Sequence, residues 1–118
     1  HFNMVIPPEE VELKILNSDI FLFCSICENL PVTLIEGMAL GAFVIAADIG
    51  PSREVLNGTG MLYSAENSDE LANCINRFML MTPTERKHRA LQSRERSFYY
   101  DANRFAGDTL DLIKATIE

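Results

Sequence analysis

The chain has 118 residues and a formal net charge of −7, with 47% apolar and 23% charged residues, a composition that excludes intrinsic disorder and a length that predicts one domain. Three cysteines cannot all pair with one another, so the sequence predicts no disulfide-stabilised secreted scaffold and favours a reducing, cytoplasmic compartment. No apolar run reaches the roughly 18 residues that a membrane span needs, and no signal peptide is recognisable.

The first part of the chain alternates apolar runs with short helical patterns. Pro8, followed by two acidic residues, is typical of a helix start, and Gly41 is typical of the left-handed residue that ends a helix. The apolar run over 20–24 lacks alternation, which is typical of a parallel strand covered on both faces. The expected elements are a strand over 2–6, a helix over 8–16, a turn over 17–19, a strand over 20–24, a helix over 32–40 and a strand over 43–47.

The second part is richer in turns and then in helices. Asn67 with Glu70, and Thr82 with Glu85, have the spacing of helix capping boxes. The expected elements are turns over 50–52 and 57–60, a short strand over 61–63, helices from 67 and from 82, and a last helix capped by Asp101 with Phe105, Thr109, Leu112 and Ile113 on one face. Strands that alternate with helices predict an α/β fold, with a parallel sheet and a helical tail.

Charge is distributed unevenly along the chain. Residues 1–76 hold two basic and eleven acidic residues, whereas residues 77–118 hold eight basic and six acidic ones. The basic run over 85–89 has two interpretations, a patch for nucleic acid or an anionic membrane and a solvated helix face. Because no aromatic residues interleave with the arginines and the whole chain is acidic, the solvated face is favoured and no nucleic-acid partner is expected.

Two carboxylates, Glu28 and Glu36, stand eight residues apart around a predicted helix start. Glu36 lies five residues beyond the start, about 7–8 Å along the axis at 1.5 Å per residue. Between the carboxylates, we expect free N–H groups on Val32, Thr33 and Leu34, at the carboxyl edge of a parallel sheet. This layout suits a nucleotide sugar, with phosphates on the amides and hydroxyl-bearing groups on the carboxylates. The spacing alone also fits a glutamate on a solvated helix face, so both interpretations stay open.

A longer pattern surrounds these two carboxylates. It consists of a serine after a strand, the E-x7-E motif, an M-A-x-G-x-x-V-I-A block and a G-x-x-x-E turn. The positions that carry it are Ser25, Glu28, Glu36, Met38-Ala39, Gly41, Val44-Ile45-Ala46, Asp48, Gly50 and Glu54. The pattern resembles the C-terminal, donor-binding domain of GT-B-fold glycosyltransferases of family 4, the group 1 transferases, over about residues 2–100.

This resemblance implies a fold and a function. The fold is a partial Rossmann-like, three-layer parallel sheet, the C-terminal half of a GT-B fold, with a nucleotide-sugar-binding domain over 1–100 and a C-terminal helix over 101–118. The function is a hexosyltransferase-like transfer of a sugar from a nucleotide-diphosphate sugar, in which Glu28 contacts the sugar hydroxyls and Glu36 the ribose. The implied binding residues are Ser25, Glu28, Asn29, Leu30, Pro31, Val32, Thr33, Leu34 and Glu36. Glu28 is the best catalytic candidate, and no metal or other cofactor is expected.

The chain also departs from the family pattern. Gly37 stands where alanine is usual and is expected to let its helix pack closely on the sheet, while Cys24 and Phe43 replace prolines. The family's diphosphate-clamping Arg and Lys, the first strands and the acceptor domain precede His1, so we expect part of a longer protein that lies in the cytoplasm or at the cytosolic membrane face. The chain alone is expected to hold half a donor site and to be inactive. Its expected partners are the missing N-terminal GT-B domain, a partner subunit or, through an exposed sheet edge, a second copy.

Two alternatives belong to other functional classes. The chain fits a noncatalytic nucleotide-sugar-binding or split-transferase subunit that docks on a partner. Cys24 and Cys27 also form a C-x-x-C pair at a strand end, where a thiol redox pair is found in thioredoxin-like proteins. Cys74 falls on an apolar helix face and is expected to be buried.

Overall fold

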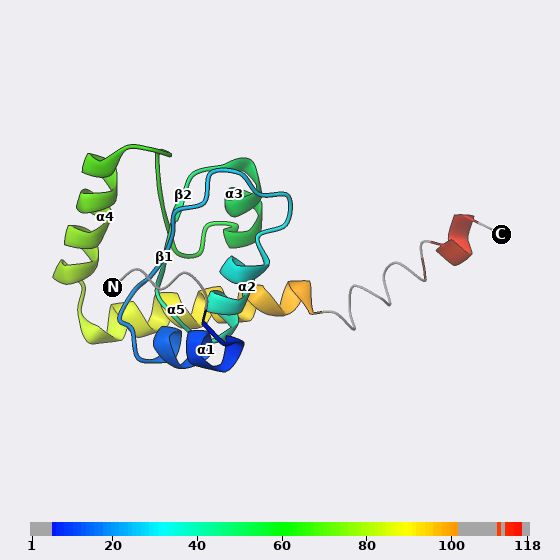
Figure 1. The fold of residues 1–118 in the computed structure, drawn as a ribbon, viewed down its shortest axis with the longest axis horizontal. Helices are drawn as coiled ribbons and strands as arrows, with labels where there is room; N and C mark the ends of the chain where they lie inside the picture. Colours follow the sequence, from blue (N-terminus) through cyan, green and yellow to red (C-terminus); the bar gives the residue numbers. More distant parts are fainter. Residues whose placement is uncertain (1–5, 102–110, 112, 117–118) are drawn as a thin grey trace.

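A computed structural model describes residues 6–101, 111 and 113–116 and shows an α/β fold (Figure 1). Three parallel strands pair in the order β1-β2-β3, with Phe21 of β1 beside Val44 of β2 and Ile45 of β2 beside Met61 of β3. The strands are β1 Phe21–Phe23, β2 Val44–Ala47 and β3 Met61–Tyr63. The helices are α1 Pro8–Leu16, α2 Val32–Ala39, α3 Gly50–Leu56, α4 Ser68–Leu80 and α5 Pro83–Ser97, followed by the 3-10 helix η1 Phe98–Tyr100.

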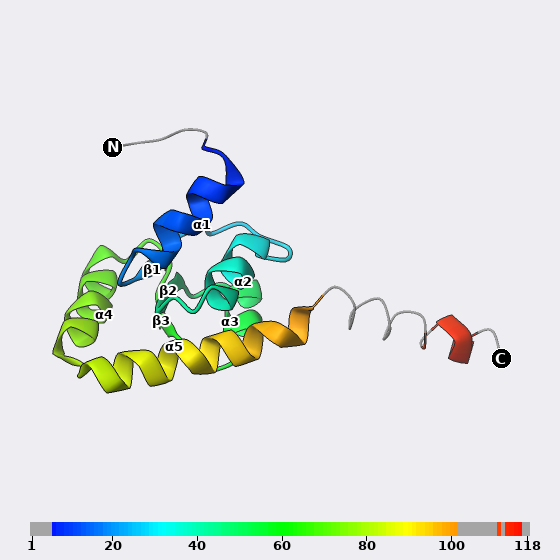
Figure 2. The same cartoon turned by 90° about the horizontal axis from the view of Figure 1, so that it is seen from below.

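Strand β2 forms the centre of the core, since all four of its residues are buried. Alternation along the strand sends its side chains to opposite faces of the sheet. The two resulting clusters are Phe23, Leu34, Met38, Val44, Ala46, Val55 and Leu56 on one face, and Phe43, Ile45, Ala47, Met61, Tyr63, Cys74 and Phe78 on the other. Helices α2 and α3 cover the first face and α4 the second (Figures 1 and 2). The predicted three-layer, Rossmann-like arrangement is therefore confirmed.

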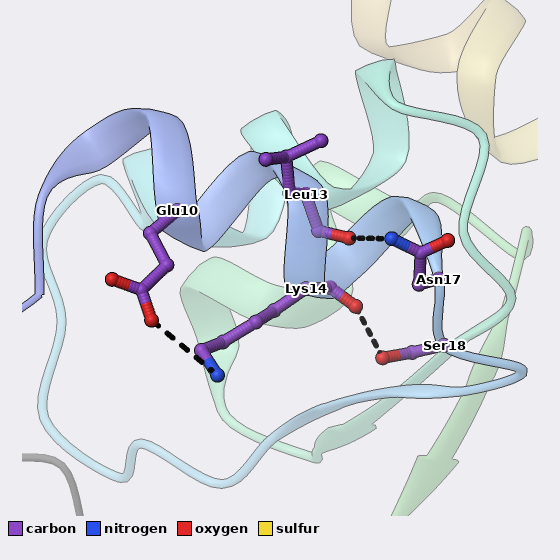
Figure 3. Close-up of polar contacts among 5 residues, drawn as sticks. All are labelled: Glu10, Leu13, Lys14, Asn17 and Ser18. Carbon is purple, nitrogen blue, oxygen red and sulfur yellow. Dashed lines mark hydrogen bonds and ion pairs between the residues drawn. The ribbon is translucent and has the colours of Figure 1, made fainter.

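Helix α1 begins at its proline, as predicted, and side chains hold its C-terminal end (Figure 3). The Asn17 amide donates a hydrogen bond of 2.8 Å to the carbonyl of Leu13, and the Ser18 hydroxyl donates to the carbonyl of Lys14. The Lys14 ammonium lies 3.6 Å from the Glu10 carboxylate, one helical turn away. The two hydrogen bonds thus add side-chain donors to carbonyls of the last helical turn, where backbone donors run out.

Local capping signals set the starts of α4 and α5. Thr82 and Glu85 form the predicted capping box, and the backbone bond to the Glu85 carboxylate lowers its pKa. At α4 the Asn67 side chain accepts from the Glu70 N–H at 3.1 Å, as the spacing predicts. The Glu70 carboxylate instead accepts from the N–H of Ser64 at 2.6 Å, and hydrogen bonding to the Ser64 side chain, together with this backbone bond, lowers the pKa of Glu70. The second half of the predicted box at α4 is therefore replaced by a link to the preceding loop.

Two basic residues of α5 have structural partners. The Arg86 guanidinium lies 4.2 Å from the centre of the Phe78 ring, and its Nε donates to the Phe78 carbonyl at 3.1 Å. The Arg96 Nε donates to the carbonyl of Val55 at 3.1 Å, and its guanidinium lies 4.7 Å from the Tyr99 ring centre. These contacts hold α5 against α4 and α3, so Arg86 of the basic run has a packing role and is not part of a purely solvated face.

The turn predicted over 50–52 is wrong, because these residues open helix α3. Pro51 lies in the first helical turn, where its missing N–H group removes no helical hydrogen bond. The Arg53 N–H then donates to the Ile49 carbonyl at 2.9 Å, and Asn57 ends the helix with a φ of 45°. The first-turn proline rule that locates α1 and α5 applies here too, although the preceding glycine favours a turn.

Strand β1 is less buried than its apolar sequence predicts. Phe23 is buried, but Leu22 is 43% exposed. Leu22 pairs with Ile45, whose side chain faces α4, and α4 packs on β2 and β3. The α4 face of β1 is therefore open in the part of the chain that the structure describes.

Two predicted elements lie largely outside the described residues. Of the strand predicted over 2–6, only Ile6 is described, and it is in neither a helix nor a strand. The last predicted helix lies mostly outside them too, with its Phe105, Thr109 and Leu112. Ile113 is helical and 48% exposed.

Candidate functional site

The loop over 24–31 follows the carboxyl end of β1 and leads into α2 (Figure 1). Pro31 precedes the helix and is buried, and its carbonyl accepts the first helical bond from Ile35 at 3.1 Å. No side chain caps this end of α2. Val32 is 55% exposed and Thr33 is also exposed, so the first turn of α2 faces solvent at the carboxyl edge of the sheet.

One of the backbone N–H groups in this first turn already has a hydrogen-bond acceptor. The Val32 N–H donates to the Leu30 carbonyl at 2.9 Å, so the prediction of a free N–H is wrong at Val32. Pro31 lies between them with φ −79° and ψ 79°, close to an inverse γ-turn, which closes such a bond across one residue. In the described part of the chain, the N–H groups of Thr33 and Leu34 have no acceptor, because the first turn of a helix supplies none.

Glu28 is held by the serine that the motif places before it. The Ser25 Oγ donates to the Glu28 Oε1 at 2.7 Å, and both residues are half-buried. The bond fixes one carboxylate oxygen, while the other has no partner among the described residues. The sequence identifies both residues, but their hydrogen bond depends on the fold of the loop.

Glu36 lies on α2 three residues after Thr33, and both face a cavity of about 480 Å³ between α1 and α2. Neighbouring helix positions three apart share a face, which explains why the two residues meet there. The other lining residues are Ile6, Pro8, Val11, Glu12, Ile15, Ala39 and Leu40. The sequence motifs do not predict that residues of α1 line this cavity. The apolar spacing of Val11 and Ile15 is the only sequence signal for it.

A comparison with protein families identifies the family to which this chain belongs. The family described as "Glycosyl transferases group 1" matches residues 1–96. The chain belongs to the group 1 glycosyltransferases. The match contains the whole sheet and every predicted site residue, and glycosyl transfer is the class of reaction that it supports. No curated protein matches the chain.

In this group 1 glycosyltransferase domain, the predicted site residues form two sets, one in the loop that precedes α2 and one on α2 itself. Thr33 and Glu36 line the cavity, whereas Glu28 bonds to Ser25 in the loop. Asn29 and Leu30 are exposed in the same loop. Pro31 and Leu34 are buried, and because Leu34 has 0% of its surface exposed, neither its side chain nor its backbone N–H reaches the surface. The solvent-exposed first turn of α2 lies between the two sets.

Gly37 sets how closely α2 approaches the sheet. A Cβ atom at this position would lie 2.5 Å from Cδ1 of the Phe21 ring in β1. The predicted close packing at Gly37 is therefore confirmed, and the missing side chain makes room for an aromatic ring.

The titratable groups near the loop include a tyrosine and two cysteines. Burial raises the pKa of the Tyr63 hydroxyl to about 12, and a hydrogen bond with the Cys24 thiol adds to the increase. Cys24 and Cys27 are free and exposed, whereas Cys74 is free and buried, and burial raises its pKa. Among the described residues, no group of three His, Cys, Asp or Glu could hold a metal ion, and no helix is long and apolar enough to cross a membrane.

Proposed function

We propose that this chain is the donor-binding part of a glycosyltransferase that moves a sugar from a nucleotide-diphosphate sugar to an acceptor. The observation that carries the proposal is the solvent-facing first turn of α2, where the N–H group of the exposed Thr33 is without an acceptor between the Glu28 carboxylate and the Glu36 carboxylate. The assigned donor-binding residues are Ser25, Glu28, Asn29, Leu30, Pro31, Val32, Thr33, Leu34 and Glu36.

The diphosphate is assigned to the first turn of α2. The N–H group of Thr33 lies at the positive end of the helix on an exposed residue, where a backbone donor and the helix dipole favour an anion. When the glycosidic bond to the nucleotide breaks, negative charge grows on the departing diphosphate. Donors fixed in a helix stabilise that charge without reorganising, which lowers the barrier to transfer. The proposal includes no metal or further cofactor, because the nucleotide-diphosphate sugar is itself the donor substrate.

The two carboxylates are assigned to the two ends of the donor. The free oxygen of Glu28 accepts from hydroxyls of the sugar, while the bond from Ser25 orients the carboxylate. Glu36 accepts from the two neighbouring hydroxyls of the ribose at the cavity wall. The cavity volume of about 480 Å³ and its largely apolar lining are those of an ordinary small-molecule site.

The acceptor is assigned to a partner. It would be an N-terminal GT-B domain of a longer chain or a separate subunit, and we propose that residues 1–118 alone have no turnover. The open face of Leu22 on β1 supports a partner there, which a second copy of the chain could also provide. Three free cysteines support a cytoplasmic location. A noncatalytic nucleotide-sugar-binding subunit would use the same site without transfer, and it would show binding but no transferase activity in the full assembly.

Calorimetric titration with UDP- and GDP-sugars tests the proposal. Glu36→Ala should weaken binding of the preferred donor by about 10- to 100-fold, since a hydrogen bond to a charged group contributes roughly 1.5–3 kcal/mol. Glu95→Ala, which removes an exposed glutamate from α5, is the matched control and should leave binding unchanged. The proposal fails if neither donor binds or if both variants behave alike.

A further inference from the structure

The cavity between α1 and α2 contains a second carboxylate that the proposed function does not use. Glu12 lines the cavity from α1, and Glu36 lines it from α2. The two helices are neighbours in both views (Figures 1 and 2). The apolar lining residues Val11 and Ile15 on α1 and Ala39 on α2 leave these carboxylates as the charged groups of the cavity wall.

Neither carboxylate has a cationic partner in the part of the chain that the structure describes. The lysine of α1, Lys14, forms its ion pair with Glu10 and not with Glu12. Among the residues that the structure describes, no cationic side chain lines the cavity. Two unpaired carboxylates on one cavity favour a ligand that donates hydrogen bonds at two separated positions, because carboxylates accept and cannot donate.

Nucleosides differ in what they donate from the base. Every ribonucleoside donates from the two ribose hydroxyls, which the proposed function places on Glu36. Guanine alone adds two adjacent donors, N1–H and the N2 amino group, which match the two oxygens of one carboxylate. Uracil offers one N3–H between two carbonyl oxygens that a carboxylate repels, and adenine and cytosine offer one amino group beside an acceptor nitrogen. The cavity therefore favours guanosine over the other nucleosides.

We infer that Glu12 recognises the base of the donor and that the donor nucleotide is a guanosine diphosphate. The inference rests on the proposed nucleotide site, since it requires the ribose on Glu36. Glu12 accepts from N1–H and N2–H of guanine, and the apolar side chains of the cavity contact the faces of the ring. Glu12 is thus a specificity-determining residue and takes no part in the chemical step.

A titration of the full chain with GDP, UDP and inosine diphosphate tests the inference. Inosine diphosphate lacks only the N2 amino group of guanine, so it removes one of the two proposed bonds. GDP should bind about tenfold more tightly than either competitor, in line with the discrimination that a bidentate base contact provides. Glu12→Gln should weaken the binding of GDP about tenfold, so that GDP and inosine diphosphate bind with similar affinity. Glu9→Gln, which removes the same charge from α1 outside the cavity, should keep the wild-type order.

Each other result overturns a defined part of the account. If UDP or inosine diphosphate binds as tightly as GDP while Glu36→Ala weakens all three, the nucleotide site stands and the base assignment is wrong. If the Glu12→Gln variant keeps the full preference for GDP, Glu12 does not recognise the base. If no nucleotide binds, the proposed function fails and the inference falls with it. The ranking of the three nucleotides on the wild-type chain tests the base assignment even if a variant does not fold.

Discussion

Replacing Gly37 by alanine sets two effects of similar size against each other. In a helix interior, alanine is favoured over glycine by about 1 kcal/mol, so propensity alone predicts that Gly37→Ala stabilises the protein. The added Cβ would lie 2.5 Å from Cδ1, 2.6 Å from Cε1 and 3.1 Å from Cγ of Phe21. Carbon atoms prefer about 3.5–4.0 Å, so the whole ring has to move by about 1 Å.

The clash should outweigh the gain in helix propensity. Phe21 packs against the buried cluster beneath α2, and extra atoms in a packed core typically cost about 1–3 kcal/mol. We expect Gly37→Ala to lower the free energy of unfolding by about 1 kcal/mol, measured by urea denaturation followed by circular dichroism. Gly50→Ala is the control, because a Cβ at Gly50 meets nothing within 4 Å, and it should leave stability unchanged or raise it.

A double mutant separates the clash from other causes. Phe21→Leu removes the ring atoms that Gly37→Ala meets, so the alanine should be neutral or stabilising in that background. A single Gly37→Ala variant that is more stable than wild type would refute the reasoning. So would a double mutant in which the alanine costs as much as it does alone.

Three further predictions concern stability and accessibility. Arg96→Ala should lower the free energy of unfolding by about 1.5–3 kcal/mol, because the Val55 carbonyl loses its charged donor, and Arg94→Ala, an exposed arginine of the same helix, should cost much less. The depressed pKa of Glu85 adds stability that is present above its ordinary value of 4.5 and is lost as the pH falls through the lower folded value, so Glu85→Gln should flatten the acid limb of a plot of urea midpoint against pH. Cys74 should react with a maleimide only after denaturation, whereas the two exposed cysteines react in the native protein, and rapid labelling of all three would contradict the packing of α4.

Much of this fold can be predicted because its signals are local. A proline in the first turn lacks an N–H that would otherwise be unpaired there, and a serine, threonine or asparagine cap accepts from an N–H a few residues on. Pro8 and Thr82 therefore mark helix starts without any knowledge of the tertiary structure. The same reasoning extends to Gly41, whose φ of 79° suits glycine at a helix end. Pro51 shows where such signals compete, since glycine before proline fits both a turn and a helix start.

The remaining features depend on the spatial arrangement of distant segments. The bond from the Val32 N–H to Leu30 arises from the backbone angles of Pro31, which sequence spacing does not determine. The cavity lined by Glu12 and Glu36 requires α1 and α2 to lie together, although the two residues are far apart in the chain. The E-x7-E spacing therefore predicts the α2 side of the site, and only the fold adds the α1 side.

The most direct test of the donor site follows the backbone amide of Thr33 by nuclear magnetic resonance while a nucleoside diphosphate is added. We predict that this resonance shifts the most among those of α2 and that its hydrogen exchange slows, because its open N–H group becomes a donor to phosphate. The Val32 amide should change less, since it already donates to Leu30. Saturable binding that leaves the Thr33 amide unperturbed would contradict the proposed donor site.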